Sequence, residues 1–98
     1  MKVNFLDKKD QIEKYFNEKM KDDVELYEDN SLFEIRYNEL EFYFLDEGAC
    51  TIDENFKVEI PKSSRYENKT DSGIVISVAE LLKFLGELFK GGNKNVSI

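Results

Sequence analysis

The chain has 98 residues, a formal net charge of −7, a single cysteine and no histidine. Its length is that of one domain, and its 41% hydrophobic and 13% aromatic residues can build a core and argue against disorder. The absence of histidine removes the commonest general base and the commonest transition-metal ligand. A lone cysteine excludes an internal disulfide and favours a reducing compartment.

The first predicted element is a helix over about residues 8–21. Asp7 is a favourable residue type for the helix N-cap, and Ile12, Tyr15, Phe16 and Met20 then recur at helical spacing. The residues before Asp7 are too few to form the apolar core of a signal peptide, and no apolar run approaches the roughly 18–20 residues of a membrane span. We therefore expect a cytoplasmic protein with no membrane partner.

From Val24 the apolar period changes to two, which predicts strands within about residues 24–60. Pro61 cannot donate a ladder hydrogen bond and should end the last strand. Tight polar turns between successive strands predict an antiparallel meander of four or five strands. The alternating segments are 24–27, 32–37, 40–45, 49–52 and 56–60.

The segment after Pro61 is polar and charged over residues 61–71, which predicts a loop. Lys62, Arg65 and Lys69 make this loop locally basic, but the negative net charge favours a solvated loop over a nucleic-acid contact. Residues 73–76 then predict a short buried strand.

The last predicted element is a helix over about residues 78–90. Ser77 and Glu80 have the spacing of a capping box, and Gly91 and Gly92 should end the helix. Gly86 costs up to about 1 kcal/mol relative to alanine in a helix, so we expect a neighbour to pack closely there. Residues 93–98 should form a frayed tail.

These elements predict a single α+β domain over residues 1–98, with the order α-β-β-β-β-β-α. A half-polar antiparallel sheet needs cover on one face, and two amphipathic helices in a single layer can supply it.

The acidic residues are concentrated in the predicted sheet. Residues 22–60 hold thirteen acids and two bases, whereas both ends of the chain are mildly basic. Alternate turns of a meander share one end of the sheet. We therefore expect Glu28 and Asp29 beside Asp46 and Glu47 at one end. At the other end, Glu39 should lie near four acids, namely Asp22, Asp23, Asp53 and Glu54.

Between these ends, the alternation places an acidic set on the outer sheet face: Glu25, Glu34, Glu41 and Glu59. Such an array could stand in for the phosphates of a nucleic acid, or could simply be a solvated surface that keeps a small protein soluble. The same face should carry four large groups, Tyr27, Leu32, Tyr43 and Leu45. They form either the core of an interface or a surface that a helix or loop covers to make a third layer.

No residue pattern predicts catalysis or a dedicated metal site. Cys50 has no histidine to activate it and is expected to be a buried structural thiol. The acidic turns at 28–30 and 53–55 lack the ligand spacing of a calcium loop. We expect no catalytic residue, no metal and no cofactor.

In size, charge and helix–sheet–helix order, the chain resembles small acidic phage inhibitors of host nucleases, including some anti-CRISPR proteins. It equally resembles small immunity proteins that neutralise a cognate bacterial toxin. The resemblance and the acidic block together predict a non-catalytic, DNA-mimic-like inhibitor of a basic nucleic-acid-handling protein in a bacterium or phage-infected host, with no direct contact to nucleic acid. An immunity protein is the alternative hypothesis, and a small-ligand-binding protein is the second alternative. The expected partner-binding residues are Glu25, Tyr27, Glu28, Asp29, Glu34, Glu41, Tyr43, Asp46 and Glu47.

Overall fold

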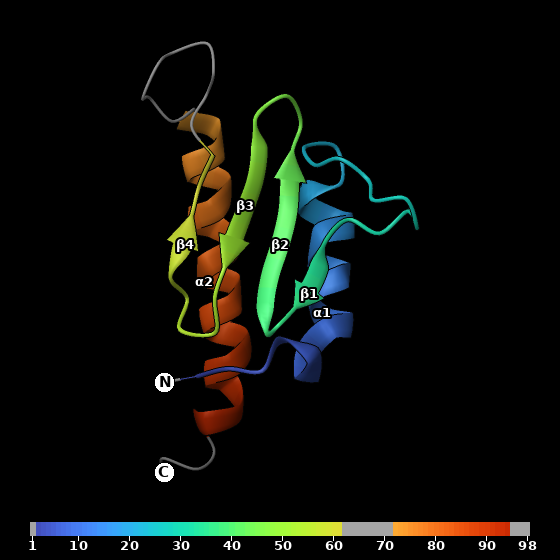
Figure 1. Ribbon diagram of the computed structural model, residues 1–98. Coiled ribbons are helices and arrows are strands. Elements are labelled where there is room, and N and C mark those ends of the chain that lie inside the picture. The colour runs from blue at the N-terminus through green and yellow to red at the C-terminus, as the bar shows by residue number, and fades with distance from the viewer. Residues whose placement is uncertain (1, 62–71, 95–98) are drawn as a thin grey trace.

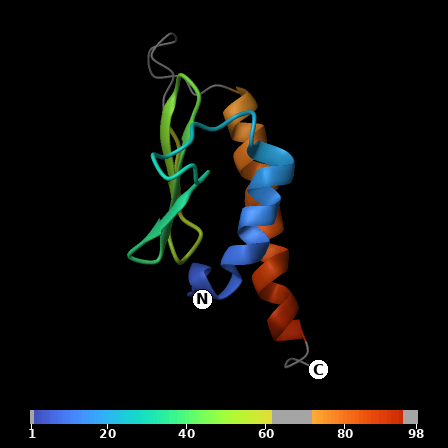
Figure 2. The same cartoon turned by 90° about the vertical axis from the view of Figure 1, so that its right-hand side faces the viewer.

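The computed structural model describes residues 2–61 and 72–94. A four-stranded antiparallel sheet forms one layer, and an N-terminal and a C-terminal helical segment form a second layer on one of its faces (Figures 1 and 2). The α+β class, the antiparallel sheet and the two flanking helices are therefore confirmed. Of the four or five strands expected, the described residues form four, so the element order with five strands is wrong.

The sheet has the sequential order β1-β2-β3-β4. Its strands are β1 (Glu34–Arg36), β2 (Glu39–Phe44), β3 (Gly48–Ile52) and β4 (Val58–Glu59). Along β2 the side chains of Leu40, Phe42 and Phe44 are buried under the helices, while those between them point to the other face. The alternation in the sequence thus identified the inner and outer faces of this strand correctly.

The segment predicted as the first strand makes only one bridge. Val24 faces Phe44, with hydrogen bonds from Glu25 N–H to the Tyr43 carbonyl (2.8 Å) and from Leu45 N–H to the Asp23 carbonyl (3.1 Å). The chain then leaves β2 and returns as β1, which pairs with the remainder of the same β2 edge. A full strand over 24–27 would need the β2 edge that β1 occupies.

The N-terminal helical segment begins as a 3₁₀ turn, η1 (Phe5–Lys8), continues as α1 (Lys9–Tyr15) and ends as a π-helical turn, η2 (Phe16–Met20). Asn4, and not Asp7, caps it: the Asn4 Oδ1 accepts the Leu6 N–H at 3.1 Å. The predicted apolar face is otherwise correct, because Ile12, Phe16 and Met20 are buried.

The C-terminal helix α2 spans Ser72–Lys94. The predictions of a strand at 73–76, of a capping box at Ser77 and of an end at Gly91 and Gly92 are therefore wrong. Ile74, Val78, Leu81 and Leu85 are all buried at helical spacing, so the apolar face begins before Ser77. The β-branched residues 74–76 favour a strand locally, but of these three only Ile74 is buried in the core.

Apart from its own helix backbone, a Cβ built at Gly86 meets no atom of the described residues within 4 Å, so they do not supply the tight packing expected there. Most of the predicted loop, at residues 62–71, lies outside the described residues, as do residues 95–98 of the predicted tail. Asn93 and Lys94, also expected in that tail, belong to α2.

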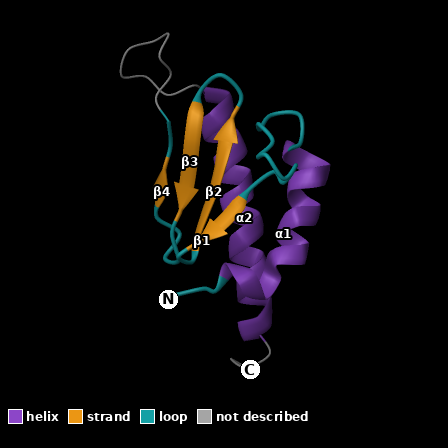
Figure 3. Ribbon diagram, turned by 45° about the vertical axis from the view of Figure 1, so that its right-hand side comes forward, coloured by secondary structure: helices purple, strands orange, loops and turns teal. Residues whose placement is uncertain are grey.

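The two helical segments run side by side over the same face of the sheet (Figure 3). The Tyr15 ring stacks on Phe84 with centroids 4.4 Å apart, which joins the helices, and Phe16 meets Phe42 edge to face at 5.1 Å, which joins helix to sheet. Within the described ranges, no helix combines the length and apolar character needed to cross a membrane.

Candidate protein-binding surface

The outer sheet face, opposite the helices, carries a row of glutamates. Glu34 lies directly across from Glu41, Glu41 across from Thr51, and Thr51 across from Glu59. Neighbouring strands are about 4.8 Å apart, so three carboxylates share one line that crosses all four strands. We call Glu34, Glu41 and Glu59 the glutamate row.

Tyr27 packs against the centre of this row. Its hydroxyl lies 3.1 Å from Glu41 Oε1 and 3.3 Å from the Glu41 carbonyl oxygen, and can donate to either acceptor. Burial, together with the nearby Glu41 carboxylate, raises the pKa of Tyr27 above its ordinary value. The phenol therefore stays protonated and holds Glu41 in place.

The single arginine of the sheet lies at one end of the row. Arg36 Nη2 is 2.6 Å from Glu34 Oε1, and this hydrogen bond, with Glu34 and Glu41 nearby, raises the pKa of Arg36. The pair is exposed, so it contributes little to stability. It does neutralise part of the charge of Glu34 and leaves Glu41 and Glu59 as the dominant negative groups.

An aromatic pair adjoins the glutamate row. Tyr27 and Tyr43 meet edge to face with ring centroids 5.8 Å apart. Glu25 lies beside Tyr43 through its backbone hydrogen bond and is exposed, as is Leu45. The structure thus brings five of the predicted partner-binding residues together: Glu25, Tyr27, Glu34, Glu41 and Tyr43.

Leu32 does not belong to this face. It is only 8% exposed and lies in the core. Its predicted place on the outer face assumed that the strand alternation of residues 33–37 also includes residue 32. The strand begins only at Glu34, however, so the alternation does not apply to Leu32.

Glu28 and Asp29 lie apart from the β2–β3 turn that holds Asp46 and Glu47, contrary to expectation. They belong to a loop that projects sideways from the sheet, whereas that turn caps one sheet end (Figure 1). Asp29 accepts the Ser31 N–H at 3.0 Å and the Ser31 hydroxyl at 2.5 Å, and these bonds, with Lys9 nearby, lower its pKa. Asp29 is therefore a structural group of its own loop.

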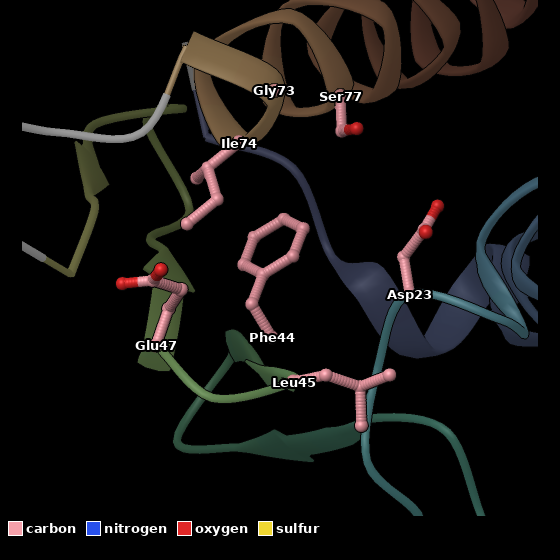
Figure 4. A pocket seen from close by; sticks show the side chains of 7 residues that line it. All are labelled: Asp23, Phe44, Leu45, Glu47, Gly73, Ile74 and Ser77. Atoms are coloured by element: carbon pink, nitrogen blue, oxygen red, sulfur yellow. The ribbon is translucent and has the colours of Figure 1, made fainter. Parts of the chain in front are cut away.

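Asp46 and Glu47 lie in the β2–β3 turn, and Glu47 lines a cavity of about 260 Å³ beside the start of α2. In Figure 4, Asp23 and Ser77 lie on one side of the Phe44 ring and Glu47 on the other. The Glu47 Oε2 atom is buried without a hydrogen-bond partner among the described residues. The cavity brings Glu47 near Ile74 and Ser77 of α2, which are distant in the sequence, so no local pattern predicts its surroundings.

The opposite sheet end holds Glu39, Asp53 and Glu54, as predicted, because Leu40 pairs with Ile52. Asp53 accepts the N–H groups of Asn55 (2.8 Å) and Lys57 (2.9 Å), so it shapes its own turn. The placement of Asp22 and Asp23 at this end was wrong: the Asp23 carbonyl bonds Leu45 at the other end.

Cys50 and the acidic side chains are the residues whose chemistry could serve catalysis or metal binding. Cys50 is fully buried, and burial raises the pKa of its thiol to about 12, so it is not a ready nucleophile. No group of three or more Cys, Asp or Glu side chains suited to a metal ion occurs within residues 2–61 and 72–94.

The chain matches no protein-family model, and the comparisons with curated proteins and with solved structures gave no match either.

Proposed function

We propose that this chain is a non-catalytic inhibitor that binds a basic, nucleic-acid-handling protein through its outer sheet face. The observation that carries the proposal is the glutamate row, which spans all four strands on the face opposite the helices. Residues 22–60 hold thirteen acids and two bases, and Glu25, Glu34, Glu41 and Glu59 lie on this face, so it attracts a positively charged surface from a distance.

The chemistry of the face suits a partner built to hold phosphates. Proteins that bind nucleic acid place lysine and arginine along the path of the backbone. Carboxylates on a rigid sheet can pair with those cations, and arginine accepts a carboxylate with the same two-pronged geometry that it uses for phosphate. Occupation of those cations would exclude the nucleic acid by direct competition.

Tyr27 and Tyr43 supply the apolar part of the contact. Tyrosines within a polar rim are frequent anchors of protein interfaces. The hydrogen bond from Tyr27 to Glu41 fixes both side chains before binding, which lowers the entropy lost on association.

The proposal is tested by capturing the partner from a lysate of the source cell or its host and measuring its binding kinetics. The double variant E41K/E59K should lower the association rate constant about tenfold at low salt, because it reverses two charges of the row. Tyr27→Ala should instead raise the dissociation rate. Added nucleic acid should compete with the chain.

The matched control is E18K/D22K, which makes the same charge change on two exposed residues, Glu18 of η2 and Asp22 of the turn that follows it. A partner whose binding responds equally to both double variants, or to neither, would contradict the proposal. If the captured partner is a toxin encoded beside this chain, the same surface serves an immunity protein.

A further inference from the structure

Strand β1 forms one edge of the sheet, and within residues 2–61 and 72–94 part of its backbone has no hydrogen-bond partner. The β1–β2 turn has two central residues, Tyr37 and Asn38, with φ values of 54° and 55°. Such a turn closes on a hydrogen-bonded pair, here Arg36 and Glu39. Because pairs alternate along an antiparallel ladder, the Ile35 N–H and C=O point away from β2.

The other end of β2 supports this assignment. The Tyr43 carbonyl and the Leu45 N–H bond the 23–25 segment, which lies on the same edge of β2 as β1. Because backbone groups alternate in direction along a strand, the N–H and C=O groups of residues 39 and 41 point to the same side as those of 43 and 45. They are therefore the β2 groups that bond to β1. Across the described part of the chain, the Ile35 N–H and C=O have no hydrogen-bond partner.

Space for another strand lies beside this edge. An open groove of about 500 Å³ runs between β1 and the first turns of the N-terminal helical segment. Its lining comes from three parts of the chain: residues 33–36 in and before β1, residues 29–31 of the preceding loop, and Leu6, Lys9 and Glu13 of the helical segment. Leu6 is 61% exposed there, and Tyr37, at the end of β1, is 95% exposed. Figure 2 looks onto this edge of the sheet.

We propose that β1 pairs with β1 of a second copy of this chain, antiparallel and centred on Ile35, to give a two-fold symmetric dimer. The two Ile35 residues would exchange both N–H···O bonds, because their free groups face outward. In this register Glu34 of each copy lies opposite Arg36 of the other, so two oppositely charged pairs form on the outer face.

Charge complementarity selects a second copy as the occupant. When two copies of Glu34-Ile35-Arg36 run antiparallel, each acidic residue faces a basic one and the two isoleucines face each other. An isologous two-fold contact requires such self-complementarity. A shift of one residue would place Ile35 opposite a charged side chain and lose both pairs. The dimer joins two sheets into one and leaves the glutamate row of each copy on the same continuous face. It does not depend on the inhibitory function proposed above.

The test is sedimentation of the full chain at about 0.15 M salt, where the Debye length of about 8 Å screens the repulsion between two acidic copies. The wild type should pass from monomer to dimer between about 10 μM and about 1 mM, as expected for a small interface. Glu34→Arg alone or Arg36→Glu alone places like charges opposite each other and should weaken the dimer about tenfold or more. The variant E34R/R36E, and an equimolar mixture of E34R with R36E, should restore it.

The control is Glu59→Arg, which reverses a charge at the opposite edge of the sheet and should leave the dimer unchanged. Circular dichroism of each variant separates loss of dimer from loss of fold. Hydrogen exchange of the Ile35 amide should slow as the concentration rises. A wild type that stays monomeric at about 1 mM, a dimer that both single reversals leave intact, or an Ile35 amide that exchanges at a concentration-independent rate would each overturn the proposal. The last two results would direct attention to another interface, or to a partner's peptide as the added strand.

Discussion

Single residues in this chain serve structural roles that their chemistry alone does not reveal. Asn38 sits in a left-handed turn, accepts the Phe5 N–H at 3.0 Å through Oδ1 and donates from Nδ2 to the Val3 carbonyl at 2.7 Å. One side chain thus ties the N-terminal segment to the β1–β2 turn. Cys50 likewise acts as a small apolar residue of the core.

The buried thiol gives a pH prediction. The pKa of Cys50 is raised to about 12 in the folded chain, against 9.0 for the ordinary thiol, so the unfolded chain loses this proton first. Fewer protons are then bound in the unfolded state, and the contribution of Cys50 to stability falls as the pH rises from about 9 to about 12. Measured by denaturant unfolding over this pH range, the free energy of unfolding should fall more steeply with pH for the wild type than for Cys50→Ala. Parallel curves would show that the thiol ionises equally in both states.

At the scale of the elements, α2 carries much of the core. Leu85 is fully buried on the same helical face as Val78 and Leu81. Leu85→Ala should lower the free energy of unfolding by about 2–4 kcal/mol, through lost burial and the cavity that remains. Urea unfolding measures the change, and Ile76→Ala, at a position that is 59% exposed, is the control. Equal effects of the two substitutions would show that the buried face is misassigned.

A substitution at Gly86, on the same helix, should raise the free energy of unfolding instead of lowering it. Its backbone is helical, and a Cβ there meets no atom within 4 Å in the part of the chain that the structure describes, its own helix backbone apart. Gly86→Ala should therefore raise the free energy of unfolding by about 0.5–1 kcal/mol, because alanine restricts the unfolded chain and favours the helix. Chemical denaturation at neutral pH measures this gain. A loss of stability would mean that α2 packs against something at Gly86.

Some elements of the fold could be predicted from sequence patterns alone, and others could not. Strand β2 and the N-terminal helix have clear periods, and their buried sets follow from them. The start of α2 was missed because the Ser77–Glu80 spacing is a plausible local cap, while burial of Ile74 depends on distant contacts. The prediction of a strand at 24–27 was wrong because β1 pairs with the same edge of β2. No local sequence pattern shows which of the two segments takes that edge.

The same reasoning explains the candidate site. The glutamate row follows from alternation within β1, β2 and β4, so local pattern predicted it. The position of Glu28 and Asp29 depends on the path of the loop before β1, and the cavity that Glu47 lines includes distant residues of α2. Neither is a property of one element.

Over the whole molecule, the repulsion between acidic side chains lowers the stability of the fold. The chain holds thirteen acids within residues 22–60, yet the described residues contain only two ion pairs, Glu34–Arg36 and Glu54–Lys2. Exposed pairs of this kind contribute about 0–1 kcal/mol each, whereas like charges directly across a sheet, as at Glu34 and Glu41, are destabilising. Repulsion therefore outweighs attraction on the outer face.

This balance predicts that salt stabilises the chain. Raising NaCl from about 10 mM to about 500 mM shortens the Debye length from about 30 Å to below 5 Å, which screens the repulsion more than it weakens two exposed pairs. The melting temperature should rise, and E41Q/E59Q should raise it at low salt and flatten its dependence on salt. Glutamine at position 41 can still accept the Tyr27 hydroxyl, so the packing is retained. The control E18Q/D22N removes the same charge from η2 and the turn that follows it, where Lys19 and Lys21 are close in the sequence, and should have a smaller effect. A melting temperature that falls with salt would mean that the ion pairs dominate and that the outer face is not under electrostatic strain.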